Sequence, residues 1–338
     1  MAKAKTSLSN FRALRVFQDS NGTCRHEIVT RSVEELPPDD LLIDVQYSSL
    51  NYKDALSATG APGVTRHYPH TPGIDAVGSV LESNTDEYQR GDIVIVTGFR
   101  LGMDRDGGFG QRIRVPAHWA VRKPKGLSLN ESMVLGTAGL TAALCVEKLT
   151  RLGMSPNSGP VVVTGSTGGV GSCAVGLLSH LGYEVHAVTG KTTHHEFLRS
   201  LGAQAIFGRE EFLDGSQRAL LRETWGGVID TVGGEMLMHA IKGLRYGCSA
   251  AACGLVSSPK FPGSVFPFIL RNVNLLGVDT AETPTAVRKR MWERLASQWK
   301  FPQLELLQSL YNLETVMAGV DRLLKGEMVG RGVVELVP

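Results

Sequence analysis

A glycine-rich turn in the middle of the chain has the residue types and spacing of an anion site. Glycines stand at positions 165, 168 and 171 of GSTGGVG, between the strand-like Pro160–Gly165 and the helix-like Val170–Leu181. Glycine lets a phosphate approach the helix N-terminus closely, where unpaired N–H groups and the helix dipole favour an anion. The spacing GxxGxxG differs from the usual GxGxxG. The segment nevertheless has a strand, a loop, a helix and a second strand in the order that a dinucleotide-binding unit has. This order favours a dinucleotide site over a tight turn that binds nothing.

The end of the next strand-like segment, Glu184–Thr189, indicates which dinucleotide binds. An NAD site normally places Asp or Glu there to hold the ribose 2′-hydroxyl, whereas the only acid of this segment stands at its beginning. Thr189 can donate a hydrogen bond, Gly190 leaves room for a phosphate, and Lys191 brings a positive charge. Arg209 follows one strand later and could close over the same phosphate or stack on adenine. We therefore expect NADPH; the alternative is that Lys191 is an ordinary solvated loop lysine.

The residues give no reason to expect a catalytic metal. Zinc alcohol dehydrogenases have the two-domain organisation that is described for this chain below, and their Cys, His and carboxylate ligands converge on the ion. Here PHTPGIDAVG carries Ile74 and Asp75 after its first glycine, no cysteine is near, and His67 and His70 are interpreted as loop surface. Neither GxSxG nor GxxxxGK[ST] occurs. The chemistry that is left is hydride transfer between a nicotinamide and an activated C=C or a quinone.

The elements that must position these residues fall into two groups. Residues from about 12 to 120 hold short alternating strand-like segments between Gly/Pro/Asp-rich turns, which predicts a β-rich domain. From Asn130, a possible N-cap, helices and strands alternate, which predicts a doubly wound parallel sheet. The closing GVVELVP is expected to return to the β-rich domain. The predicted class is α/β, with residues 1–130 and 281–338 in one discontinuous domain and residues 131–280 in the other.

Composition excludes several classes of function. The 338 residues are 42% hydrophobic and 20% charged, and a formal net charge of +2 gives no reason to expect nucleic acid as a partner. Five scattered cysteines fit reduced thiols better than a disulfide framework. The N-terminus lacks an apolar h-region, and no segment approaches 18 uninterrupted apolar residues. We expect a cytoplasmic protein with no membrane span.

Several blocks of the chain resemble the zinc-free medium-chain dehydrogenase/reductase superfamily, and within it the acrylyl-CoA reductase (AcuI/YhdH-type) quinone oxidoreductase-like family. NYKDAL and PGID are shared by many zinc-free members, whereas AACGL and PFILRNVNLLGVD are more particular. The resemblance covers essentially the full length and extends over SSLNYKDALSATG (48–60), HTPGIDAVG (70–78), GTAGLTAALCV (136–146), VVVTGSTGGVGS (161–172), GVIDTVGG (227–234) and GRGVVELV (330–337). It implies a GroES-like domain built from both chain ends and a Rossmann domain that binds NADPH.

The resemblance also implies roles for individual residues. Tyr52 of NYKD is expected to face the nicotinamide, with Leu255, Ile269 and Thr280 lining it. The residues expected to hold the pyrophosphate are Ser166, Thr167, Gly168, Gly169, Val170 and Gly171. Those expected on the adenosine 2′-phosphate side are Thr189, Gly190, Lys191 and Arg209.

The implied reaction passes hydride from NADPH to the β-carbon of acryloyl-CoA and gives propanoyl-CoA. The thioester oxygen gathers negative charge as an enolate, which the site must stabilise with hydrogen-bond donors, and the α-carbon then takes a proton. Tyr52 is the candidate donor or acid; the alternative is that it packs on the cofactor while solvent supplies the proton. The alternative functions are an NADPH-dependent quinone or enone reductase and a non-catalytic NADPH-binding protein.

Two expectations concern partners. The charged CoA tail calls for basic residues, and the sequence offers candidates without placing them: Arg66, Arg100, Arg105 and Arg271, the last of which could equally be structural. By analogy with related dimers, the LLGVD strand is expected at the edge of the Rossmann sheet, where it would pair with its copy in a homodimer.

Overall fold

The computed structural model describes residues 10–336, which fold into two compact units. Of the described residues, one unit comprises 10–137, 281–296 and 308–336, and the other comprises 138–280 and 297–307. The expected domain ranges differ from these units in two segments. Residues 131–137 lie with the first unit, and residues 297–307 lie with the second, where the Phe301 ring packs so closely on Gly176 that a Cβ there would be 2.7 Å from it.

The first unit is built on a seven-stranded sheet. Its path is β14-β15-β3-β4-β5-β7, with β6 paired to β3 off this path, and β1 and β2 form a separate antiparallel hairpin. The strands are β1 (Asn10–Gln18), β2 (Cys24–Ser32), β3 (Leu41–Leu50), β4 (Asp75–Ser83), β5 (Ile93–Thr97), β6 (Arg112–Val115), β7 (Ala120–Arg122), β14 (Gln308–Tyr311) and β15 (Arg331–Glu335). The helices are α2 (Tyr52–Ala58), α9 (Thr285–Leu295) and α10 (Val316–Leu324), with short 3-10 turns η1 (Val33–Glu35) and η2 (Ala117–Trp119).

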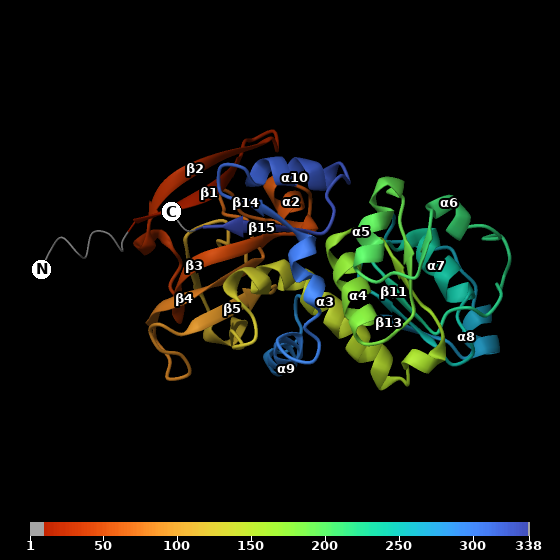
Figure 1. Ribbon diagram of the computed structural model, residues 1–338. Coiled ribbons are helices and arrows are strands. Elements are labelled where there is room, and N and C mark those ends of the chain that lie inside the picture. Colours follow the sequence, from red (N-terminus) through yellow and green to blue (C-terminus); the bar gives the residue numbers. More distant parts are fainter. Residues whose placement is uncertain (1–9, 337–338) are drawn as a thin grey trace, which may run out of the picture. The chain divides into compact units, whose positions relative to one another are not determined.

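The predicted return of the C-terminal strand to this unit is observed. β15 runs antiparallel to β3 with Val333 opposite Ser49, and Figure 1 shows this blue strand beside the red-orange one. Alternating residues of β3, among them Leu41, Ile43 and Val45, enter a buried core with Phe109. This period of two is what lets one face of a strand face the core.

The second unit is a Rossmann fold. Its sheet has the order β10-β9-β8-β11-β12-β13 with every pairing parallel, which is the doubly wound order 3-2-1-4-5-6. Its strands are β8 (Val161–Thr164), β9 (Val185–Val188), β10 (Ala205–Phe207), β11 (Gly227–Asp230), β12 (Ser249–Ala252) and β13 (Asn274–Gly277). Its helices are α4 (Gly169–His180), α5 (His195–Ser200), α6 (Arg209–Phe212), α7 (Gly234–Lys242) and α8 (Phe266–Arg271), with η3 (Pro156–Ser158), η4 (Thr192–His194) and η5 (Pro302–Leu307).

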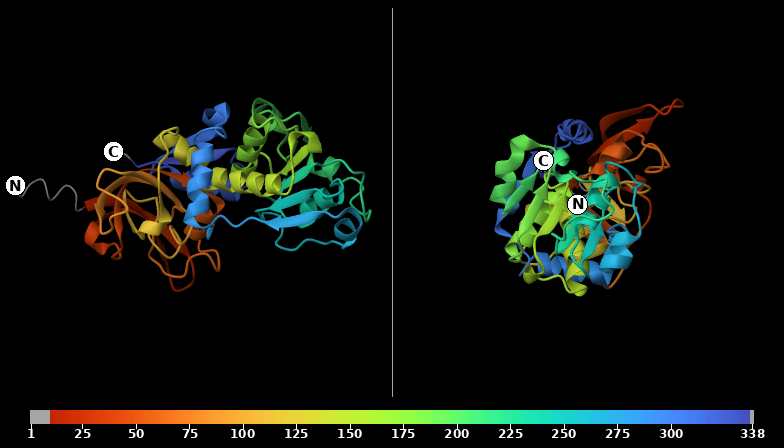
Figure 2. Two further views of the ribbon diagram at one scale, coloured as in Figure 1. Left: turned by 90° about the horizontal axis from the view of Figure 1, so that it is seen from below. Right: turned by 90° about the vertical axis from the view of Figure 1, so that its right-hand side faces the viewer.

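Helices cover both faces of this sheet, as the alternating sequence predicts. α4 and α5 lie on one face and α7 on the other, and the green to cyan strands between them are seen side by side in the right-hand view of Figure 2. The central strands β8 and β11 are buried along their whole length. Burial on both sides explains why they are apolar runs instead of alternating segments.

The long helix α3 (Leu129–Arg151) begins earlier than expected and is bent. Its N-terminus is capped by Ser128, not Asn130: the Ser128 hydroxyl accepts the Glu131 N–H at 3.0 Å, and the Glu131 carboxylate accepts the Ser128 N–H at 2.7 Å. Gly136 interrupts it with a φ of 47°, a left-handed conformation that favours glycine. α3 is long and apolar enough to cross a membrane, but 78% of its apolar window is buried in the structure, as in a core helix.

Candidate functional site

The turn between β8 and α4 is tightly packed at Gly171, where the helix meets the strand, and open at Gly168. A Cβ on Gly171 would stand 2.3 Å from the Gly165 carbonyl oxygen, so helix and strand approach as closely as a glycine allows. A Cβ on Gly168 would meet only that same oxygen, at 3.3 Å. Gly168 is the N-cap of α4 and offers no side chain to the first-turn N–H groups, which have no partner within a helix. This geometry fits a phosphate group.

Ser166 and Thr167, both expected to hold the pyrophosphate, turn their side chains inward. The Ser166 hydroxyl donates to the Val163 carbonyl oxygen at 2.6 Å and accepts the Val188 N–H at 2.9 Å, and its own N–H donates to Val188. The Thr167 hydroxyl is buried 3.1 Å from that of Thr189. Both donors of Ser166 are therefore used within the fold, one on β8 and one on β9, which leaves the N–H groups of α4 to bind a phosphate.

The residues expected around a 2′-phosphate come together after β9. The Thr189 N–H donates to Phe207 of β10 at 3.0 Å, and its hydroxyl accepts the Lys191 N–H at 3.1 Å. Arg209 opens α6, and a Cβ on Gly190 would lie 2.7 Å from its Nε atom. The tertiary structure thus brings the Arg209 guanidinium against the Thr189–Lys191 turn.

Two acids near this turn, Glu184 and Glu211, are engaged elsewhere. Glu184, at the start of β9, lies 2.9 Å from the ring of His186. Glu211 caps α6 by accepting the Gly208 N–H at 3.3 Å. The end of β9 therefore carries a hydroxyl, a glycine and a lysine, as the sequence indicates.

Sequence reasoning missed Asp230, which lies where the strand order of the sheet reverses. It ends β11 and accepts hydrogen bonds from the Thr164 hydroxyl at 2.6 Å and the Gly233 N–H at 2.7 Å, which joins the ends of the neighbouring strands β8 and β11. Burial raises the pKa of Asp230, and these hydrogen bonds partly offset it. Ligands of such sheets bind at this reversal. The sequence signal that could have identified Asp230 is an acid at the end of an apolar strand-like run, as in GVID.

The three residues expected to line the nicotinamide do not share one edge of the sheet. Leu255 follows β12 and Thr280 follows β13, so both stand beyond the carboxyl ends of these parallel strands. Ile269 lies on α8, before β13 begins, and Arg271 at the end of that helix accepts the Gly247 N–H ahead of β12. Because α8 leads into the start of β13, Ile269 lies at the amino edge of the sheet. Its side chain is 69% exposed. The Thr280 hydroxyl lies 2.7 Å from that of Thr141.

Tyr52 is the first residue of α2 and is 41% exposed. The helix start is fixed by Asp54, whose carboxylate accepts the N–H groups of Asn51 at 2.8 Å, Gly73 at 3.1 Å and Ile74 at 2.8 Å. Asp54 therefore joins NYKD to PGID, a contact between two motifs that sequence reasoning treated separately.

Most of the arginines considered for a CoA tail have other partners. Arg100 pairs with Asp104, and Arg105 pairs with Asp39. Arg271 donates to the carbonyl oxygens of Lys242 and Leu221 and is structural. Arg66 is exposed in the loop that follows α2.

Among residues 10–336, no three His, Cys, Asp or Glu side chains lie together as metal ligands would. His67 is exposed, but the expectation that His70 is also surface is wrong. His70 exchanges two backbone hydrogen bonds with Val16, and its Nε2 atom lies 2.8 Å from the Ser57 hydroxyl oxygen. This pairing draws the loop inward, and burial lowers the pKa of His70 to about 4.

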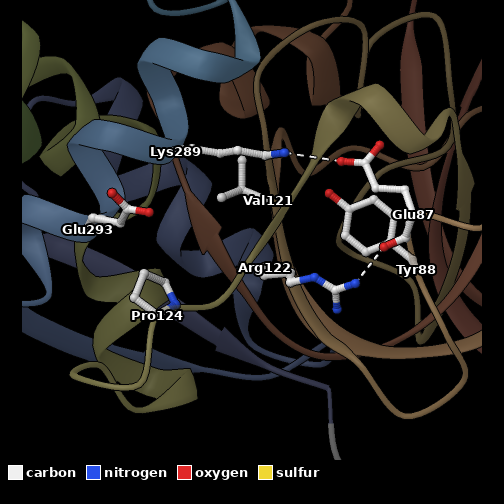
Figure 3. A pocket seen from close by; sticks show the side chains of 7 residues that line it. All are labelled: Glu87, Tyr88, Val121, Arg122, Pro124, Lys289 and Glu293. Carbon is white, nitrogen blue, oxygen red and sulfur yellow. Dashed lines mark hydrogen bonds and ion pairs between the residues drawn. The ribbon is translucent and has the colours of Figure 1, made fainter.

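A pocket of the first unit offers no further candidate site. Figure 3 shows its lining, which comes from β7, α9 and the segment before β5: Glu87, Tyr88, Val121, Arg122, Pro124, Lys289 and Glu293. Lys289 pairs with the Glu87 carboxylate at 3.1 Å, and Arg122 donates to the Glu87 carbonyl oxygen at 2.5 Å. Arg122 also pairs with Asp92 outside the lining, and none of the expected site residues lines this pocket.

Comparison with known proteins agrees with this architecture. The sequence-family model described as alcohol dehydrogenase GroES-like domain matches residues 37–125, and the one described as zinc-binding dehydrogenase matches residues 169–297. Two curated relatives are each 42% identical over 327 residues, covering 96% of this chain and 99% of theirs: putative quinone oxidoreductase YhfP of Bacillus subtilis and acrylyl-CoA reductase AcuI of Ruegeria pomeroyi.

Two solved structures have nearly the same fold, each at 41% identity. The yhdH oxidoreductase of Salmonella enterica in complex with NADP gives a TM-score of 0.93, covering 96% of this chain and all of that one. B. subtilis yhfP with NAD bound gives 0.94, covering 97% of this chain and all of that one.

Proposed function

Because the chain belongs to the medium-chain dehydrogenase/reductase superfamily, in its acrylyl-CoA reductase (AcuI/YhdH-type) quinone oxidoreductase-like family, we propose that it reduces acryloyl-CoA to propanoyl-CoA with NADPH. The protein is an oxidoreductase of this family. The proposed substrate is supported by the 42% identity of this chain, over nearly the whole of both chains, to a relative named acrylyl-CoA reductase.

The cofactor proposal rests on two parts of the Rossmann unit. The uncapped N-terminus of α4 supplies N–H groups for the pyrophosphate, and the glycine at 168 leaves space before them. The turn Thr189–Lys191 with Arg209 supplies positive charge and room for a 2′-phosphate. One relative is described with NADP and another with NAD, and the absence of an acid at the end of β9 supports NADPH here.

In the proposed reaction, bound NADPH supplies a hydride to the β-carbon of the acryloyl group, and the α-carbon gains a proton. The residues must stabilise the negative charge that develops on the thioester oxygen. Tyr52 is the candidate donor or acid, since it is an exposed phenol whose helix start is held by buried hydrogen bonds. The reaction is proposed to need no zinc and to occur in the cytoplasm.

A homodimer is proposed as the assembly. β13 is one of the two edge strands of the Rossmann sheet, and α8, which precedes it in the chain, exposes a group of apolar side chains: Phe266, Ile269 and Leu270. A second copy could continue the sheet and cover them. Light scattering should give twice the chain mass for the wild type and a smaller particle for Ile269→Asp; a wild-type monomer at micromolar concentration would contradict the proposal.

A quinone or enone reductase is the second candidate, favoured by the relative named putative quinone oxidoreductase. The deciding experiment compares kcat/KM for acryloyl-CoA, a soluble quinone and a simple enone with NADPH, before and after treatment with a chelator. We expect acryloyl-CoA to be preferred and the chelator to have no effect. Preference for the quinone or enone would move the assignment to the second candidate, and NADPH binding with no turnover would indicate a non-catalytic protein.

A further inference from the structure

Two fully buried aspartates lie at the start of α2, joined by one amide. Asp54 belongs to α2 and Asp75 begins β4, and neither is exposed to solvent. The Asn51 side-chain amide donates to Asp75 at 2.9 Å and to Asp54 at 3.3 Å. The residue after Asn51 is Tyr52, so this bridge holds the backbone next to the candidate proton donor.

Asp75 is held from the other side by α3. Its carboxylate accepts the Thr137 N–H at 2.9 Å, the Thr137 hydroxyl at 2.5 Å and the Ser49 hydroxyl at 2.5 Å. A Cβ on Gly136 would stand 2.6 Å from the carboxylate of Asp75. The bend of α3 at Gly136 therefore places a backbone donor on this buried acid.

One buried arginine, Arg331, lies near Asp75 and binds the Asn51 amide that joins the two aspartates. Arg331 of β15 donates to the Asn51 side-chain oxygen at 3.1 Å and to the Ser49 hydroxyl at 2.9 Å, and its Nη2 atom lies 3.9 Å from Asp75. Burial, reinforced by the nearby Asp75, raises the pKa of Asp54 to about 7, while the Asn51 and Ile74 hydrogen bonds oppose this shift.

The other titratable side chains against α2 are exposed or neutral near pH 7: the buried His70 lies 2.8 Å from the Ser57 hydroxyl of α2, and burial lowers its pKa to about 4. Lys53 is exposed on α2 itself, and Asp321 and Arg322 are exposed on α10, which packs on α2 (Figure 1). The buried Asp54 therefore faces the charge of Asp75 from β4, while Arg331 from β15 lies near Asp75 and reaches Asp54 only through Asn51. Burial and the like charge of Asp75 both disfavour the ionised form of Asp54, so a proton on this carboxyl is favoured.

We propose that Asp54, Asn51 and Arg331 are positioning residues for the proposed reduction: they fix the first turn of α2, and with it Tyr52, and they do so fully only when Asp54 is ionised. An ionised Asp54 accepts the N–H groups of Asn51, Gly73 and Ile74. A proton on the carboxyl removes one acceptor position and loosens this anchor. The inference rests on the proposed function only for its effect on rate.

The first test is Asp54→Asn, which keeps the size of the side chain and places an amide donor opposite the donors of Asn51. We expect kcat/KM at pH 8 to fall about tenfold to a hundredfold. The wild-type rise in kcat/KM near pH 7 should disappear, while the Kd for NADPH should change little. The exposed neighbour provides the control, since Lys53→Ala should keep both the rate and the pH profile. A purely structural role for Asp54 would lower the melting temperature and leave the pH profile of the folded fraction unchanged, which would overturn the proposal.

Two further measurements keep the proposal testable if Asp54→Asn does not fold. A ¹³C NMR titration of aspartate carboxyls in the wild type, without cofactor or substrate, should show a carboxyl that titrates near pH 7; none between pH 6 and 8 would overturn the ionisation. Asn51→Ala should lower kcat/KM and leave the Kd for NADPH nearly unchanged; wild-type kinetics would overturn the positioning role. If acryloyl-CoA is not the substrate, the NMR titration still tests whether Asp54 ionises near pH 7. The kinetic comparisons are then made with the quinone or enone that the enzyme reduces.

Discussion

Gly190 and Arg209 lie against each other, so that a Cβ on Gly190 would stand 2.7 Å from the Nε atom and 3.0 Å from the Cζ atom of the arginine. The glycine follows β9, and the arginine opens α6 after β10. Parallel pairing of these two strands brings together residues that are separated in the chain. A glycine here lets the guanidinium lie over the turn where a 2′-phosphate is expected.

Gly190→Ala should therefore displace Arg209 and weaken NADPH binding. We expect the Kd for NADPH to rise about tenfold, which corresponds to about 1.4 kcal/mol, and the Kd for NADH to rise less. Cofactor titration followed by fluorescence measures both. Gly208→Ala is the matched control, since a Cβ there meets nothing within 4 Å. Equal effects of the two substitutions would show that contact with Arg209 is unimportant.

Lys191→Ala should discriminate between the two cofactors. Only NADPH carries the 2′-phosphate, and a charge-assisted hydrogen bond contributes about 1.5–3 kcal/mol, so its Kd should rise about tenfold to a hundredfold. The Kd for NADH should change little, and Lys191→Arg should keep most of the preference because it keeps the charge. Equal weakening of NADPH and NADH would contradict the cofactor assignment.

Tyr52→Phe tests the candidate acid. If the phenol donates a proton or hydrogen bond in the transition state, kcat should fall about a hundredfold or more, with the Kd for NADPH nearly unchanged. Steady-state kinetics on the preferred substrate measures the loss. Tyr246→Phe removes an exposed phenol of the other unit and serves as the control. An unchanged kcat would assign the proton to solvent and leave Tyr52 a packing role.

His70 should make the protein sensitive to acid. Its folded pKa of about 4 lies below its ordinary value of 6.5 because burial disfavours the charged ring. Between these values the unfolded chain binds the extra proton, so the free energy of unfolding should fall as pH drops from about 6.5 to 4, by up to about 1.4 kcal/mol per pH unit from this residue. Urea unfolding of His70→Gln should show a shallower pH dependence over this window, whereas His67→Gln, at an exposed position, should follow the wild type. Parallel slopes for all three proteins would sink this explanation.

Local patterns in the sequence were informative where one segment specifies one element. The alternation in LLIDVQYSSL and the apolar runs PVVVTG and GVID predicted β3, β8 and β11, because the order of apolar and polar residues in a strand shows which of its faces are buried. The polar strand β2 and the short β14 were not foreseen, since their half-exposed residues show no clear period. At the start of α3 the capping box of Ser128 and Glu131, which begins two residues before Asn130, sets the helix start because it satisfies two N–H groups together.

By itself, the sequence determined the glycine turn, the choice of Thr189, Gly190 and Lys191 over an acid, and the return of the last strand. Each depends on neighbours in the chain or on one strand's pattern. Only the tertiary structure decided that Arg209 lies against Gly190, that Ile269 stands at the amino edge of the sheet, and that Arg331 meets Ser49, 282 positions earlier. Local residue types do not specify which distant strands will be neighbours. The buried cluster of Asp54, Asp75 and Arg331 exists because the helix α2 and the strands β4 and β15 bring its members to one place, where burial strengthens the interaction between charges.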